Sequence, residues 1–292
     1  MRAPFLLLTP VCIFLGAASA YYGAGTFRMD FFLLAFFGGL CAHISVNALN
    51  EYDDFKTGLD HTTTRTPFSG GSGTLPRHPE KAYYALSIGL ISLAGTVFTG
   101  AYFLWVRGPL LLPLGILGIL AIVLYTRLLT RDPFLCLLAP GIGFGPCMVM
   151  GTAFIMTGSY SLVAFAASMV PFFLVSGLLL VNQFPDIEPD AAAGRHHLMI
   201  AHGKKAGVVV YGLFLAGTYL LIALSWVAGL FPGSALILPL LTAPLAIYTW
   251  TGIATHFTGR IEDMLPYMGK NVIITLLTPI LLTIGLIAGR FY

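Results

Sequence analysis

The chain has 292 residues, of which 57% are hydrophobic and only 9% carry a formal charge, and its mean hydropathy is +0.87. Soluble domains carry charge on about a quarter of their residues, so this composition excludes that class and indicates a polytopic membrane protein. The net charge of +3 comes without any basic cluster, which argues against a nucleic-acid partner.

Apolar stretches long enough to cross about 30 Å of hydrocarbon recur along the whole sequence. Nine are expected, at 5–22, 30–50, 82–105, 108–127, 134–157, 161–183, 206–229, 233–256 and 271–290. None has the residue alternation of a barrel strand, so helices must satisfy the backbone hydrogen bonds. The predicted fold class is therefore all-α: a polytopic bundle of about nine transmembrane helices, with residues 1–292 as a single domain.

Lysine and arginine are distributed unevenly over the predicted loops. Of the fifteen, all except Arg28, Arg107 and Arg290 fall on one side, and the positive-inside rule makes that side the cytoplasm. We expect a multi-pass protein of the inner (plasma) membrane with a cytoplasmic N-terminus. The first twenty residues also resemble a signal peptide ending at Ala20. We favour an uncleaved helix, and cleavage would leave eight spans without inverting them.

Acidic residues gather on the same side, with Asp30 as the exception. Two long cytoplasmic loops, 51–81 and 184–205, carry much of this charge, and long connections in a helical bundle suggest function. Asn50-x3-Asp54 closes the second span. Its spacing returns 132 residues later in a second group, which closes the sixth span and reads Asn182-x3-Asp186-x3-Asp190. This repeat suggests duplicated four-helix units.

Residues four apart share a helix face, so each group predicts an acidic stripe at a helix end. Pro185 and Pro189 should kink or end the second stripe. Two facing stripes would repel each other unless cations lay between them. Mg²⁺ takes oxygen ligands and is usually held by one or two carboxylates together with substrate phosphates. The stripes therefore predict a diphosphate clamp bridged by Mg²⁺.

Basic residues on the same side would suit an anionic ligand. They are Arg65, Arg127, Arg131, Arg195, Lys204 and Lys205. A plainer interpretation stays open, in which the acids are solvated helix ends paired with Lys56, Arg195 and Lys204.

Three segments, "NEYDDFKTGLD", "GGSGTLP" and "NQFPDIEPDAAAGRHHL", resemble the Asp-rich signatures of the UbiA-type intramembrane prenyltransferases. The family patterns are NDxxDxxxD and DxxxD, and the residues that match them are Asn50, Asp54, Asp186 and Asp190. Glu51 replaces the usual Asp, while Gly58 takes the slot of the last acid and Asp60 follows two residues later. The "DFKTGLD" form resembles the branch that prenylates 1,4-dihydroxy-2-naphthoate on the way to menaquinone.

A third family element, a Tyr followed by Ser and a Lys, is similar to "YTRLLTR", which supplies Tyr125, Thr126 and Arg131. The resemblance implies a role for each matched position. Metal ligands would be Asn50, Glu51, Asp54, Asp186 and Asp190. Diphosphate ligands would be Asn50, Arg65, Arg131, Asn182 and Lys204. Catalytic groups would be Asp54, Tyr125, Arg131 and Asp186.

The implied activity is Mg²⁺-dependent transfer of a polyprenyl group from its diphosphate to an aromatic acceptor, inside a central cavity open at the cytoplasmic side. The lipid bilayer would receive the prenyl tail. Naphthoate is the first choice of acceptor, followed by 4-hydroxybenzoate, homogentisate, a tetrapyrrole or a lipid. An ion-coupled transporter is the alternative from another class. P-loop enzymes are excluded because the sequence has no GxxxxGK[ST].

Overall fold

The computed structural model describes residues 3–63 and 65–291, and in these residues every regular element is a helix or a helical turn. The helices are α1 Leu8–Ala24, α2 Met29–Lys56, α3 Leu59–Thr62, α4 Thr74–Arg77, α5 Ala82–Arg107, α6 Leu112–Leu124, α7 Pro133–Ile142, α8 Gly151–Thr157, α9 Leu162–Asn182, α10 Ile187–Ala192, α11 Leu198–Val227, α12 Gly233–Leu240, α13 Ala243–His256 and α14 Ile261–Ala288. Short helical turns join them: η1 Ala3–Leu7, η2 Pro79–Lys81, η3 Pro109–Leu111, η4 Leu129–Arg131 and the π-helical η5 Gly143–Met150.

Eight helical stretches of the described chain are long and apolar enough to cross a membrane. Two of them contain two α-helices each, because Pro133–Thr157 joins α7, η5 and α8, and Gly233–His256 joins α12 and α13. A ninth apolar stretch, Pro109–Leu124, is shorter than the roughly 20 residues that a full crossing needs. The predicted all-α membrane bundle is thus confirmed, with the fourth expected span as its short member.

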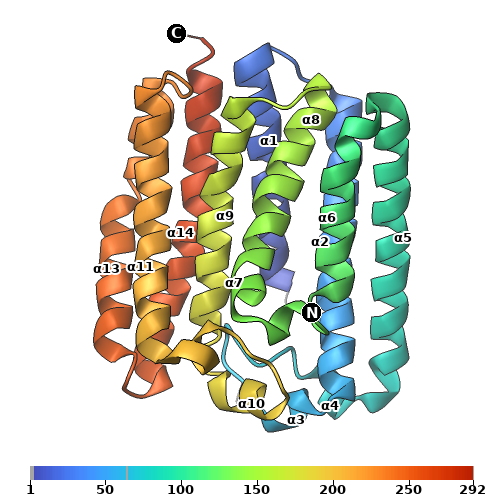
Figure 1. The fold of residues 1–292 in the computed structure, drawn as a ribbon, viewed down its shortest axis with the longest axis vertical. Coiled ribbons are helices and arrows are strands. Elements are labelled where there is room, and N and C mark those ends of the chain that lie inside the picture. Colours follow the sequence, from blue (N-terminus) through green and yellow to red (C-terminus); the bar gives the residue numbers. More distant parts are fainter. Residues whose placement is uncertain (1–2, 64, 292) are drawn as a thin grey trace.

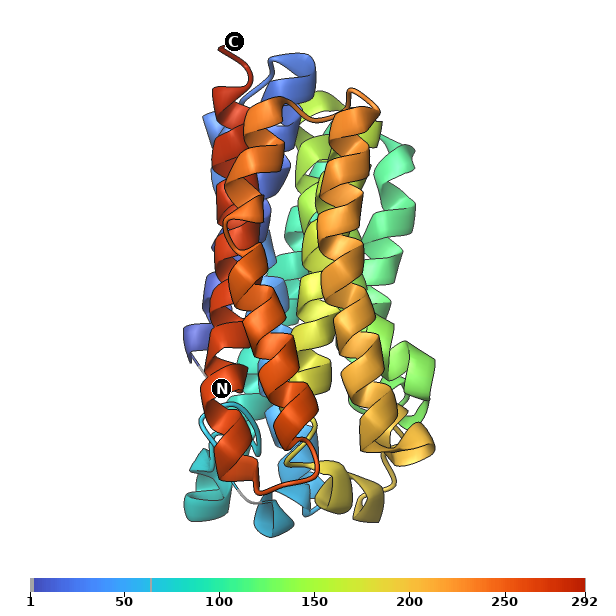
Figure 2. The same cartoon turned by 90° about the vertical axis from the view of Figure 1, so that its left-hand side faces the viewer.

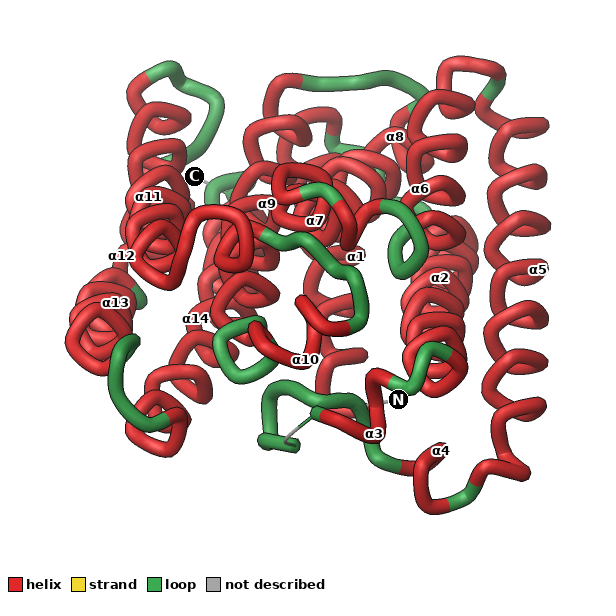
Figure 3. Tube along the Cα trace, turned by 60° about the horizontal axis from the view of Figure 1, so that its bottom comes forward, coloured by secondary structure: helices red, strands yellow, loops and turns green. Residues whose placement is uncertain are grey.

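The long helices stand side by side, and the short helices α3, α4 and α10 gather at one end of the bundle (Figure 1). We call this end, formed by 57–81 and 183–197, the polar end. The C-terminus lies at the opposite end, beyond α14, in both side views (Figures 1 and 2). Seen from below, the chain around α3 and α10 crosses the end of the bundle near α9 and α2 (Figure 3).

Local sequence explains where several helices begin and bend. Asp132 caps α7, because its carboxylate accepts hydrogen bonds from the backbone N–H of Phe134 and Leu135, both at 2.9 Å. Pro146 lies inside η5 and lacks the N–H that a regular helix requires, which accounts for the irregular π-helical stretch. Gly203 interrupts α11 with φ of 80° and ψ of 163°. The predicted span from 206 therefore begins after this kink.

The core is centred on α9, which packs against α1, α7, α11 and α14. Its inner residues are fully buried, among them Val170, Leu174 and Val181. Glycines let neighbouring helices approach closely: a Cβ on Gly145 would lie 2.4 Å from the Ser168 carbonyl oxygen of α9. This packing fixes the end of α9, where Asn182 of the second acidic group lies.

Candidate active site

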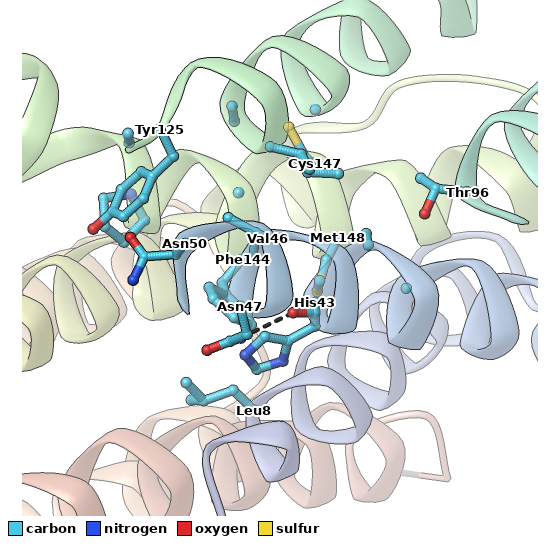
Figure 4. Close-up of a pocket in the computed structure, with 18 of the residues that line it drawn as sticks. Leu8, His43, Val46, Asn47, Asn50, Thr96, Tyr125, Phe144, Cys147 and Met148 are labelled. Atoms are coloured by element: carbon cyan, nitrogen blue, oxygen red, sulfur yellow. Dashed lines mark hydrogen bonds between the residues drawn. The ribbon is translucent and has the colours of Figure 1, made fainter. Parts of the chain in front are cut away.

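A cavity of about 760 Å³ lies inside the bundle and extends to the polar end. Its polar end is lined by Asn50, Glu51, Asp54, Asp60, Asn182, Gln183, Asp186, Asp190, Arg195 and His197. The rest is largely apolar, with lining residues such as Leu104, Leu111, Ile119, Phe144 and Met148. Figure 4 shows Asn50 beside Tyr125 at one end of the view, with Asn47 and His43 farther along α2. The cavity therefore joins a charged end to a long hydrophobic compartment.

The first acidic group lies in the last turns of α2, as its spacing predicts. The Asn50 side-chain amide donates a hydrogen bond to Asp54 Oδ2 at 3.0 Å, so the two share one helix face. Thr126, from the "YTR" element, donates to Asn50 Oδ1 at 2.9 Å. Glu51 accepts a hydrogen bond from Ser72 of the loop that follows. The amide of Asn50 is thus held in a fixed orientation from both sides.

Gly58 ends α2, with a positive φ of 79° that a glycine adopts without steric cost. This explains why the last acid of the family pattern is displaced, because an aspartate there would be strained. The chain turns back through α3, and Asp60 lines the same cavity with only 4% of its surface exposed. Asp60 is therefore a site residue to which the sequence motifs give no role.

The second acidic group does not form one stripe on a single helix, so the shared face predicted from the spacing is wrong, whereas the predicted interruption of the helix near Pro185 is confirmed. Asn182 is the last residue of α9, Asp186 precedes α10, and Asp190 lies within α10. Proline is the cause, because Pro185 has no N–H to continue the helix and disfavours the helical conformation at the residue before it. All three side chains nevertheless line the cavity, and the backbone N–H of Gly70 donates to Asp186 Oδ2 at 3.3 Å.

Arg195 connects the two groups. Its Nη1 lies 3.0 Å from Asp190 Oδ1, and its Nη2 forms a short ion pair with Asp54. The three side chains are largely buried, with exposed fractions of 19% for Arg195, 5% for Asp190 and 11% for Asp54. The sequence analysis names Arg195 among the basic residues that suit an anionic ligand and among those that could pair with the acids, and the structure shows the pairing. The partner Asp54 could not be predicted, because nothing in the motif spacing indicates a contact across 141 positions.

The charges at the polar end perturb one another. Burial raises the pKa of Asp60 to about 6, and the nearby carboxylates of Asp54 and Glu51 act in the same direction. Burial likewise raises the pKa of Asp190 to about 6, although Arg195 opposes this change. For Arg195, burial favours loss of its charge, but the two carboxylates outweigh burial and raise its pKa. The site therefore holds more negative charge than its surroundings readily stabilise, and Arg195 supplies part of the compensation.

Three basic residues predicted to bind diphosphate do not line this cavity. Arg131 lies in η4 and Lys204 follows the kink in α11, and both are exposed. Arg65 is also exposed, and its guanidinium donates to the Asp60 carbonyl oxygen at 3.3 Å and packs against Gly73. Tyr125, in contrast, lines the cavity next to the acidic groups. The predicted acids and amides are thus brought together, whereas the predicted cations stay outside.

The donor atoms suit a divalent metal that is shared with an anionic ligand. In the described part of the chain, no three acidic, imidazole or thiol groups lie close enough to enclose a metal by themselves. However, Asn182 Oδ1 and Asp60 Oδ2 are buried and have no hydrogen-bond partner. Such oxygens, beside the carboxylates of Asp54 and Asp186, fit Mg²⁺, which usually takes one or two protein carboxylates and completes its shell with phosphate and water.

Comparisons with known proteins identify the family. Residues 9–261 match the UbiA prenyltransferase family. The 1,4-dihydroxy-2-naphthoate octaprenyltransferase of Bacillus subtilis is 31% identical over 68% of this chain and 62% of its own length. The enzyme of the same name from Haemophilus influenzae is 27% identical over 99% of this chain and 94% of its own length. The matched region thus spans less than two thirds of the Bacillus protein.

Solved structures share the fold. A UbiA homologue from Aeropyrum pernix K1 superposes with a TM-score of 0.74 at 19% identity, covering 99% of this chain and 98% of that one. A homologue from Archaeoglobus fulgidus, bound to DMAPP and Mg²⁺, gives 0.60 at 18% identity, covering 97% and 98%. The family match over most of the chain decides the assignment: the protein belongs to the UbiA prenyltransferase family.

Proposed function

We propose that the protein transfers a polyprenyl group from its diphosphate to an aromatic acceptor in a Mg²⁺-dependent reaction, and that the acceptor is 1,4-dihydroxy-2-naphthoate. One observation carries the reaction class: two acidic groups from distant parts of the chain meet at the polar end of an otherwise apolar cavity. The acceptor rests on the "DFKTGLD" form of the first motif and on the relatives from Bacillus and Haemophilus, both named as naphthoate prenyltransferases.

In this proposal, the diphosphate lies at the polar end. The metal would be held jointly by the diphosphate and by oxygens from the two acidic groups, which offer Asn50, Glu51, Asp54, Asp186 and Asp190. Its charge would stabilise the leaving diphosphate. The Thr126 hydroxyl fixes the amide of Asn50 for this task. The Gly70 N–H, which donates to Asp186, would keep the 65–73 loop over the site. Arg65 lies on this loop, so it can reach phosphate oxygens if the loop shifts when the substrate binds.

The remaining cavity suits the reactive carbon and its tail. Breaking the C–O bond leaves an allylic cation, which must be kept from water until the ring carbon attacks. Apolar walls exclude water, and aromatic rings such as those of Tyr125 and Phe144 stabilise a cation through their π faces. For naphthoate, the ring carbon that gains the prenyl group loses its carboxylate as CO₂, and pyrophosphate leaves with the electrons of the C–O bond.

A slot between α5 and α6 gives a long tail a way into the lipid. Gly100 and Ala101 of α5, with Gly115 and Ile116 of α6, line the cavity and are exposed. A Cβ added at Gly100 or Gly115 would meet no atom within 4 Å, so there is free space beside both glycines. The tail would extend from the polar end along α6 and leave between the two helices.

The membrane orientation follows from the same placement. The positive-inside rule puts the polar end in the cytoplasm, where a water-soluble acceptor and the diphosphate head group are both available. We therefore place the protein in the inner (plasma) membrane with a cytoplasmic N-terminus.

Product mass spectrometry tests the proposal directly. Purified protein with Mg²⁺ and a prenyl diphosphate is offered 1,4-dihydroxy-2-naphthoate, 4-hydroxybenzoate and homogentisate in parallel. We expect a prenylated product from the naphthoate alone, with the mass of one carboxylate lost as CO₂. A naphthoate product that keeps its carboxylate would exclude this form of the reaction, and transfer only to another acceptor would reassign the substrate.

A further inference from the structure

We propose that Arg195 is a positioning residue that takes the place of the metal in the substrate-free enzyme and makes metal binding depend on the diphosphate. This inference rests on the proposed function. It concerns a residue that the aspartate motifs do not include and that the structure places between them.

The contact geometry carries the first step. One guanidinium binds Asp54, in the first acidic group, and Asp190, in the second, through two different nitrogens. Both carboxylates are expected metal ligands. Arginine presents its donors as a rigid fork, so a single side chain satisfies two carboxylates that would otherwise repel each other across a buried space.

The backbone holds Arg195 in this position. Its N–H donates to the Asp190 carbonyl oxygen at 2.9 Å, and the N–H of the next residue, His196, donates to the Thr130 carbonyl oxygen at 2.9 Å. Gly194 turns the chain with a φ of 79°. The side chain therefore starts from a fixed point at the rim of the cavity, and only its flexible part needs to move when its partners change.

Charge carries the second step. The guanidinium and a divalent cation compete for the same carboxylate oxygens, so a metal that arrives alone must displace a buried arginine or lie beside its positive charge. A diphosphate lowers the free energy needed to displace the arginine, because its oxygens accept hydrogen bonds from the freed guanidinium while they also bind the metal. Metal and diphosphate should therefore bind cooperatively, with Arg195 transmitting the coupling.

A purely structural ion pair would look the same in a static structure, since buried pairs also serve only to hold segments together. The two roles differ in one measurable quantity, which is the affinity for metal in the absence of diphosphate. Loss of a structural pair loosens the site and weakens metal binding. Loss of a competing cation strengthens it.

The experiment measures Mn²⁺ binding to the full-length protein in detergent, without prenyl diphosphate, by the electron paramagnetic resonance signal of free Mn²⁺. Mn²⁺ stands in for Mg²⁺ because it prefers the same oxygen ligands. We expect R195Q to bind Mn²⁺ more tightly than the wild type, by a factor in the range of about 5 to 150 that is typical of such couplings.

R127Q is the matched control. Like R195Q, it removes one positive charge from an arginine that pairs with an aspartate of α2, here Asp53. Unlike Arg195, Arg127 is 71% exposed, and neither Arg127 nor Asp53 lines the cavity. Its Mn²⁺ affinity should equal that of the wild type. R195K keeps the charge without the fork and should fall between the wild type and R195Q, so it carries the test if R195Q does not fold.

The outcomes separate the inference from the proposed function. Tighter Mn²⁺ binding by R195Q and R195K, with R127Q unchanged, supports the role of Arg195. Equal or weaker binding in both Arg195 variants overturns it and leaves the metal-dependent transferase intact. If neither the wild type nor any variant binds Mn²⁺ without prenyl diphosphate, Arg195 is not what limits metal binding and the inference is overturned. The same titration with prenyl diphosphate present then tests the proposed metal site separately, because that site includes the diphosphate oxygens.

Discussion

The adjacent carboxylates Asp53 and Asp54 offer the sharpest test of the proposed site. Their side chains leave α2 in different directions: Asp54 lines the cavity and contacts Arg195, whereas Asp53 pairs with Arg127, at 3.0 Å, outside the cavity. Replacing each by Asn removes one negative charge and keeps the side-chain volume. A difference between D53N and D54N therefore reports the direction of the side chain and not the loss of charge.

The expected magnitudes follow from burial. The Asp53–Arg127 pair has an arginine 71% exposed, and exposed pairs contribute roughly 0.2–1 kcal/mol, so D53N should be nearly as stable and active as the wild type. Removing one partner of a buried pair costs about 3–5 kcal/mol. The cost of D54N should lie below this range, because Arg195 keeps Asp190 as a partner. Losing a carboxylate that holds the metal, and with it part of the positive charge that stabilises the leaving diphosphate, should lower kcat about 10²- to 10³-fold.

The assay follows pyrophosphate release from a prenyl diphosphate in the presence of naphthoate, together with thermal unfolding of each purified variant. D54N should be folded and nearly inactive, and D186N should behave in the same way because Asp186 also lines the polar end. If folded D54N kept more than about a tenth of the wild-type kcat, or if D53N lost as much activity as D54N, Asp54 would not be a metal ligand.

Three further predictions concern other parts of the chain. Gly115→Phe should block the slot between α5 and α6. Because Gly115 lies about 15 Å along α6 from Tyr125, the KM for long prenyl diphosphates should rise, whereas a five-carbon prenyl diphosphate should react as before. Equal effects on both substrates would place the tail elsewhere. Gly252→Ala should destabilise the protein by about 1–3 kcal/mol, because its Cβ would lie 2.0 Å from the Tyr267 ring; an unchanged melting temperature would contradict this packing. Removal of divalent metal with EDTA should abolish transfer, and added Mg²⁺ should restore it, whereas turnover that persists in EDTA would exclude the proposed metal.

Much of the fold could be predicted because it depends on short-range rules. Hydropathy alone places the spans, since any lipid-exposed segment must be apolar and helical. The spacing of Asn50 and Asp54 correctly predicts a shared face, because α2 continues to Lys56. The same rule fails for Asn182 and Asp186, because it requires a continuous helix and Pro185, which lies between them, does not allow one.

The cations of the site could not be predicted, and the reason is physical. Positive residues on the cytoplasmic side are common to membrane proteins, so several were equal candidates. Which of them enters the cavity depends on backbone turns such as the one at Gly194, and on packing between segments far apart in the sequence. Arg195 is brought inward, while Arg131 and Lys204 remain exposed.

A buried group of carboxylates needs positive charge nearby, because removing the carboxylates from water costs free energy that an opposite charge must offset. Either an arginine or a metal ion can supply that charge. The sequence therefore predicts the requirement for a cation and names Arg195 among the candidates, and the three-dimensional arrangement selects Arg195 from them. In our proposal, Arg195 supplies this positive charge before the diphosphate binds, and the metal that arrives with the diphosphate supplies it afterwards. The acids at the polar end can thus remain compensated before and after the diphosphate binds, which allows a strongly negative site to persist in the empty enzyme.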